Sequence, residues 1–86
     1  MPPMHVRVHL FARARDLAGT DAVDVAVTPG ATVRELRRRL AAEHPRLGGL
    51  LERSALAVNN EFAGDDTILS DQAEVALLPP VSGGRL

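Results

Sequence analysis

Hydrophobic and polar residues alternate along several short segments, which is the pattern of strands with one buried face. The alternation runs through residues 4–11 and 21–27, and it returns over residues 55–59 and 73–79. Residues 60–66 form a turn region, with a further very short strand expected near Phe62 or Thr67–Ile68. Residues expected on the buried faces of the first two strands are Met4, Val6, Val8, Leu10, Val23, Val25 and Val27.

A helical period replaces the alternation after Pro29–Gly30. Val33, Leu36 and Leu40 form one apolar stripe, and Thr32 precedes Glu35 by the spacing of a capping box. Pro45 disfavours a helical residue before it, so the helix is expected to end there.

The charged residues of this helix indicate an ion pair and a solvated face. Glu35 and Arg39 have the i, i+4 spacing of a favourable ion pair. The arginines at 37–39 are expected on a solvated face, since they wrap around the helix.

Two segments lack a clear period. Residues 12–21, with Gly19, are expected to connect the first two strands as a hairpin loop. Residues 46–54 are expected to form an irregular or short helical connector, with Gly48–Gly49 in a loop.

The order of elements is strand, strand, helix, strand, short strand, strand. Each element has one apolar side, so one main helix must cover one face of a mixed sheet of about four to five strands. With the first and last strands adjacent in the centre, this is the α+β, ubiquitin-like β-grasp arrangement. The expected division is a β-grasp domain over residues 1–78 and an extended tail over 79–86, with the second sheet face open to solvent or a partner.

Composition narrows the classes of function. The chain has 86 residues, a formal net charge of −1, no cysteine, and ten basic residues that are all arginine. Disulfides, thiolate nucleophiles and zinc–cysteine sites are excluded, as is Schiff-base chemistry on a lysine. Nothing indicates nucleic-acid or membrane binding, and without a signal-peptide pattern a cytoplasmic location is expected.

No arrangement of side chains forms an evident active site. His5 and His9 share a strand face, but they lie about 13 Å apart, too far to chelate one ion. Asp65, Asp66 and Asp71 are interpreted as turn and cap residues, since they stand beside glycine and serine. We therefore expect no metal site, no permanently bound cofactor and no enzymatic activity of the chain by itself.

The last ten residues, LLPPVSGGRL, favour an exposed arm. Pro79–Pro80 ends the last strand and favours an extended segment, and Gly83–Gly84 can approach another backbone closely. If the first and last strands are parallel neighbours, Phe11 and Leu78 lie outward at the root of this arm as a candidate docking patch. A frayed terminus without function and an isolated exposed apolar residue are the alternatives.

Three stretches resemble the MoaD family, the small sulfur-carrier subunits of molybdopterin synthase. They are VHLFARARDLAG at residues 8–19, VNNEFAGDDTILSDQAEVA at 58–76, and the adjoining LLPPVSGG at 77–84. The resemblance implies a β-grasp fold and places partner contacts on Phe11, Phe62, Leu78, Pro79, Pro80, Val81 and Ser82.

The resemblance also implies a reaction cycle that partner proteins carry out. A ubiquitin-activating-like enzyme, MoeB in the family, uses ATP to adenylate the carboxylate of Gly84, and a sulfur donor converts it to a thiocarboxylate. Gly83 allows the slim tail to enter the large subunit, MoaE, where sulfur passes to the cyclic pyranopterin precursor of molybdopterin.

One departure from the family concerns Arg85 and Leu86, which follow the second glycine. An amide-linked Gly84 has no carboxylate to adenylate. Three explanations are open: a protease removes the two residues, they derive from cloning, or this form is inactive. Processing would favour a first alternative, a sulfur carrier for another pathway (cysteine or thiamine-type biosynthesis). A second alternative is a ubiquitin-like protein modifier joined to lysines of other proteins. A plain binding domain with an inert tail is the remaining alternative.

Overall fold

A computed structural model describes residues 2–78 of the chain. The strands are β1 (Met4–Leu10), β2 (Ala22–Val27), β3 (Ala55–Val58), β4 (Glu61–Ala63) and β5 (Glu74–Leu78). The helices are α1 (Ala12–Ala18), α2 (Val33–Glu43) and α3 (Gly48–Arg53), and a 3-10 turn, η1 (Pro45–Leu47), joins the last two. The expected tail over 79–86 lies outside the described residues.

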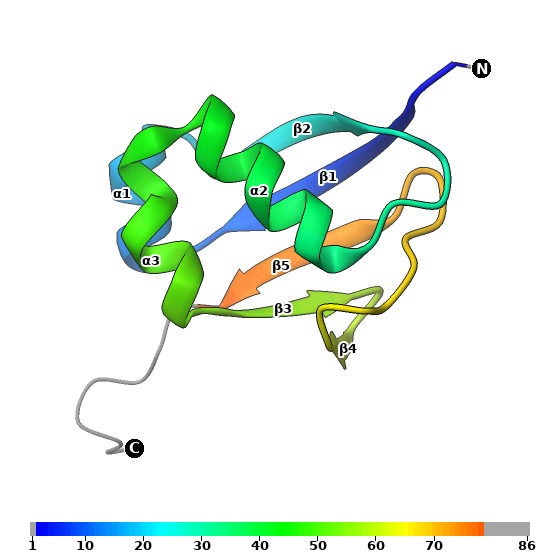
Figure 1. Ribbon diagram of the computed structural model, residues 1–86. Coiled ribbons are helices and arrows are strands. Elements are labelled where there is room, and N and C mark those ends of the chain that lie inside the picture. The colour runs from blue at the N-terminus through cyan, green and yellow to red at the C-terminus, as the bar shows by residue number, and fades with distance from the viewer. Residues whose placement is uncertain (1, 79–86) are drawn as a thin grey trace.

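The five strands form one mixed sheet in the order β2-β1-β5-β3-β4. β1 and β5 run parallel at its centre, and the remaining neighbours are antiparallel (Figure 1). The helices all lie over one face of this sheet (Figure 1). The sequence-based expectation of a ubiquitin-like β-grasp fold is confirmed.

The core lies between the sheet and α2. The apolar stripe of α2 is completely buried, as expected from its period. The inward residues of the two central strands meet it from the sheet, and Leu10 and Leu77 are among the largest fully buried side chains. The valine at 23 is partly buried at the edge of this core, whereas Val25 and Val27 are buried.

Local signals explain both ends of α2. The Thr32 hydroxyl accepts from the backbone N–H of Glu35, and the Glu35 carboxylate accepts from the backbone N–H of Thr32. This is the expected capping box, and Pro45 begins the 3-10 turn directly after the C-cap His44.

The expected ion pair between Glu35 and Arg39 is wrong. Glu35 binds back to the helix N-terminus, and Arg39 instead pairs with Glu43 at 3.4 Å. The Glu35 carboxylate is more stable in the capping hydrogen bond than in an ion pair with Arg39. The capping bond satisfies an otherwise unpaired backbone donor, whereas an exposed i, i+4 pair contributes only about 0.5 kcal/mol.

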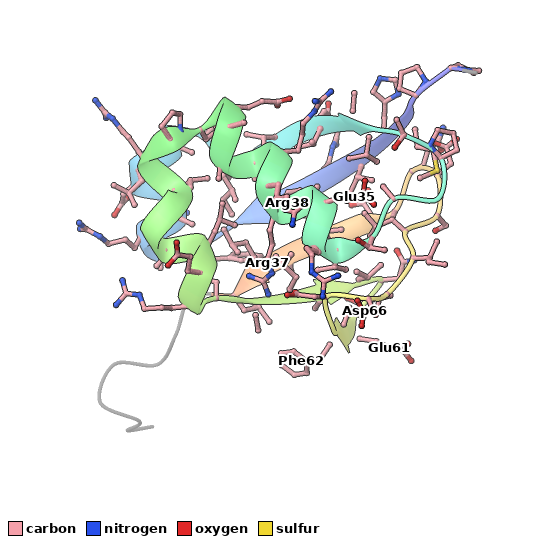
Figure 2. All side chains as sticks on the ribbon, viewed as in Figure 1. Glu35, Arg37, Arg38, Glu61, Phe62 and Asp66 are labelled. Carbon is pink, nitrogen blue, oxygen red and sulfur yellow. The ribbon has the colours of Figure 1, made fainter. Side chains whose placement is uncertain are left out.

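Arg37 also departs from the expected solvated face. Its side chain is 22% exposed, and its Nη1 donates to the carbonyl oxygens of Leu51 at 2.5 Å and Ser54 at 2.9 Å. Its Nε donates to Asp65 at 2.9 Å. Arg37 therefore joins α2 to the end of α3 and to the loop after β4 (Figure 2).

Both expected connectors contain helix. Residues 12–18 form α1, which ends at Gly19 in the left-handed conformation with φ 77°. The expected hairpin loop is therefore wrong, because all residues of the segment except Asp16 are alanine, arginine or leucine, which are strong helix formers. Gly48 and Gly49 open α3, so the loop interpretation of this pair is also wrong, whereas the short helical connector is confirmed.

Of the two positions considered for a very short strand after β3, the one near Phe62 is confirmed, whereas Thr67–Ile68 forms no strand. Phe62 lies in β4, and Ile68 forms an isolated bridge with Thr32. None of the helices within residues 2–78 has the length and apolar character needed to cross a bilayer.

Candidate functional site

The register of the central strands places Phe11 and Leu78 at one end of the sheet. Leu10 lies opposite Leu77 in the parallel pair of β1 and β5. Both leucines face the core, so the next residue of each extended strand faces the opposite side. Phe11 is extended at φ −129° and ψ 155° and is 46% exposed, and Leu78 is partly exposed. The expected juxtaposition at the last described residue of β5 is confirmed.

Phe62 belongs to the same outer face of the sheet. It lies opposite Ala57 of β3, which lies opposite Ala76 of β5. Phe62 is 79% exposed and projects from β4 into solvent, away from α2 (Figure 2). Ala55, which lies opposite Leu78, continues the apolar area toward the end of β5.

These side chains form one apolar area, which we call the docking surface. Large exposed aromatic groups are typical anchors of protein interfaces, and the small alanines between them leave room for side chains of a partner. The docking surface consists of the exposed or partly exposed Phe11, Ala55, Phe62, Ala76 and Leu78, with Ala57 between them, which is only 9% exposed.

The residues proposed from the sequence for the tail itself lie outside the described residues. These are Pro79, Pro80, Val81, Ser82, Gly83 and Gly84. The described chain ends at Leu78, where β5 runs beside the start of β3 (Figure 1). The docking surface therefore lies at the point from which the tail continues.

The other half of the outer face is charged. Arg7 of β1 lies between Asp24 of β2 and Glu74 of β5 in the strand register. Arg7 Nε donates to Asp24 Oδ1 at 3.1 Å. This hydrogen bond and the charge of Asp24 raise the pKa of Arg7, with a smaller contribution from Glu74. A shallow hollow of about 310 Å³ lies here, lined by His5, Arg7, Asp24, Gln72 and Glu74.

His9 stands at the border between the two halves. Its Nε2 lies 2.6 Å from Oε1 of Glu74. In the strand register His9 is opposite Ala76 of the docking surface. Sequence reasoning missed this pair, and the alternation of β1 and β5 could have indicated only that both residues face outward.

The remaining candidates have structural partners. Asp65 pairs with Arg37, Asp66 pairs with Arg34 at 2.9 Å, and Asp71 Oδ1 accepts from the backbone N–H of His5. Their interpretation as loop residues rather than acid/base groups is consistent with these contacts. Within residues 2–78, His, Asp and Glu side chains form no group of three suited to a metal ion.

Comparison with known proteins identifies the family. A family model described as the ThiS family matches residues 8–84, a span that includes the whole docking surface. The chain belongs to the ThiS family.

A curated relative in this family has a stated role. The chain is 43% identical over 81 residues to the molybdopterin synthase sulfur carrier subunit of Escherichia coli, covering 92% of this chain and 99% of the relative.

Two solved structures similar to this ThiS-family chain carry different descriptions. The crystal structure of SAMP1 from Haloferax volcanii is 33% identical with a TM-score of 0.80, and the match covers 93% of this chain and 99% of that chain. A protein–protein complex of subunits 1 and 2 of molybdopterin-converting factor from Helicobacter pylori has a matching chain that is 28% identical. Its TM-score is 0.67, and the match covers 94% of this chain and 100% of that chain.

Proposed function

We propose that this protein is the sulfur-carrier subunit of a molybdopterin synthase and that Gly84 carries the sulfur. The observation that carries the proposal is the docking surface at the root of a segment that contains Gly83–Gly84, in a chain of the ThiS family. The identity with the Escherichia coli sulfur carrier subunit supports the choice of pathway.

The chemistry takes place on the carboxylate of Gly84. An adenylating enzyme related to ubiquitin-activating enzymes joins this carboxylate to the α-phosphate of ATP and releases pyrophosphate. A hydrosulfide equivalent from a donor then attacks the acyl carbon, the bond from this carbon to the AMP oxygen breaks, AMP leaves, and the product is a thiocarboxylate. This route needs no cysteine on the carrier, in agreement with its composition.

The partner that receives the sulfur is the large subunit of the synthase. The docking surface binds this subunit and directs the tail, Pro79 to Gly84, toward its active site. Gly83 has no side chain, so the tail can enter a narrow channel beside the pyranopterin precursor. The complex of two molybdopterin-converting factor subunits from Helicobacter pylori supports this type of partner.

Arg85 and Leu86 must be removed before the cycle begins. Hydrolysis of the peptide bond between Gly84 and Arg85 by a processing protease releases the carboxylate that ATP activates. A full-length chain is therefore an inactive precursor.

Mass spectrometry of the intact protein from its own cells tests the carrier function. We expect a chain that ends at Gly84 with one oxygen replaced by sulfur. A full-length chain without sulfur, in cells that make molybdopterin, contradicts the proposal.

The activation step can be tested separately with purified proteins. Chains 1–84 and 1–86 are each incubated with the adenylating enzyme and ATP, and pyrophosphate release is measured. We expect release with chain 1–84 alone. Equal release with both chains contradicts the proposed need for processing.

A ubiquitin-like protein modifier is the second candidate, favoured by the match to SAMP1 (small archaeal modifier protein 1) from Haloferax volcanii. In that case Gly84 would be joined to lysines of other proteins. The chain has no lysine, so it cannot form chains of itself through side-chain amines. Covalent adducts on cellular proteins, without a free thiocarboxylate, would decide for this candidate.

A further inference from the structure

We propose that His9 and Glu74 form a proton-linked recognition pair, and that the partner binds the form in which His9 is protonated. The inference rests on the proposed function, because it takes the large subunit of molybdopterin synthase as the partner. It assigns a recognition role to two residues at the border of the docking surface.

The strand register places His9 in line with the docking surface. His9 of β1 lies opposite Ala76, and the same row continues through Ala57 to Phe62 of β4. The His9 ring nevertheless contacts Glu74, which lies in the neighbouring row toward the charged half. The two side chains are 39% and 60% exposed, so both are open to a partner.

A partner that contacts both aromatic residues must also cover His9. Within this row, three strand spacings, or about 14 Å, separate His9 on β1 from Phe62 on β4. Phe11 follows His9 by two residues on the same strand, or about 7 Å. A standard interface covers about 800 Å² on each partner, or about 28 Å across, which is longer than both separations. His9 and Glu74 are therefore desolvated when Phe11 and Phe62 are covered.

The charges around His9 make its protonation favourable in that complex. Glu74 of β5 contacts the His9 ring, and Arg7 is the next outward residue on its own strand. The Arg7 guanidinium is itself paired with Asp24 of β2 at 3.1 Å. Because Arg7 and Asp24 balance each other, a neutral His9 leaves the carboxylate of Glu74 without a compensating charge. With a protonated His9, the group is balanced. Covering an unbalanced carboxylate costs more than covering an ion pair that keeps its hydrogen bond, so docking takes up a proton.

Titration calorimetry of the full chain with the purified large subunit tests the inference between pH 6 and pH 8. We expect binding to tighten as the pH falls, by up to about tenfold per pH unit, because the complex holds one more proton than the free proteins. Titrations in buffers with different heats of ionisation measure this proton uptake directly.

Variants distinguish His9 from other titrating groups. His9→Gln is expected to remove most of the change in affinity between pH 6 and pH 8. His5→Gln is the matched control, because His5 faces outward from the same strand about 13 Å away and is expected to leave the dependence unchanged. Glu74→Gln is expected to flatten or reverse the dependence, since the group is then balanced with a neutral histidine.

The outcomes separate the two proposals. Tight binding with the same pH dependence in the wild-type chain and in His9→Gln overturns the recognition role and leaves the carrier function intact. Binding of the wild-type chain that does not change with pH does the same. Absence of binding at every pH, in all variants alike, contradicts the proposed function and the inference together.

Discussion

Leu10 of β1 and Leu77 of β5 lie opposite each other in parallel register, and both are almost completely buried. This pair fixes the positions of Phe11 and Leu78, which follow in each strand and face the other side of the sheet. The core of the protein and the root of its tail are therefore determined by the same contact.

Leu77→Ala and Leu78→Ala are expected to affect different properties, the stability of the fold and the binding of the partner. Leu77→Ala should lower the free energy of unfolding by about 2–5 kcal/mol, because it leaves a cavity in the core. Leu78→Ala should change stability by less than about 1 kcal/mol but weaken binding of the large subunit about tenfold. Urea unfolding and titration calorimetry measure the two effects, and a large loss of stability in Leu78→Ala would contradict its assignment to the docking surface.

Phe62→Ala should weaken binding of the large subunit about tenfold or more, as expected for an aromatic anchor that a partner buries. Its stability should change by no more than about 0.5 kcal/mol, because the side chain is 79% exposed. Arg38→Ala is the control, since Arg38 is exposed on α2, which lies over the other face of the sheet (Figure 1). Equal losses of affinity in the two variants would argue against a defined docking surface.

Arg37→Gln should lower the free energy of unfolding by about 1–3 kcal/mol, because it removes hydrogen bonds to the partly buried carbonyls of Leu51 and Ser54. Arg34→Gln is the control on the same helix. Arg34 also pairs with an aspartate, but its side chain is 49% exposed, so the loss should stay below about 1 kcal/mol. Denaturant unfolding of both variants checks the difference, and equal losses would contradict the role given to Arg37.

Thr32→Ala should destabilise the protein by about 1 kcal/mol, because the N–H of Glu35 loses its capping acceptor. Thr20→Ala is the control: the Thr20 hydroxyl also bonds to backbone, but outside a helix N-terminus, and the residue is exposed. Thermal unfolding of the two variants provides the measurement. A capping role would be refuted by an unchanged midpoint in Thr32→Ala.

Much of the candidate site could be predicted from the sequence. Alternation assigned Phe11 and Leu78 to outward positions, and the order of elements indicated that their strands are neighbours. The alanines of the docking surface were not predicted, because small residues give no signal until the register aligns Ala57 with Ala76 and Phe62.

The amino-acid sequence by itself determined the strands, the main helix and both ends of that helix. These features depend on contacts within a few residues, such as the Thr32–Glu35 capping box and the block imposed by Pro45. Only the tertiary structure decided the partners of polar side chains that reach another element of the fold. Arg37 reaches across to α3, and His9 meets Glu74, which is 65 positions away in the chain. Such partners are set by how helices and strands pack, and local sequence patterns carry no record of that packing.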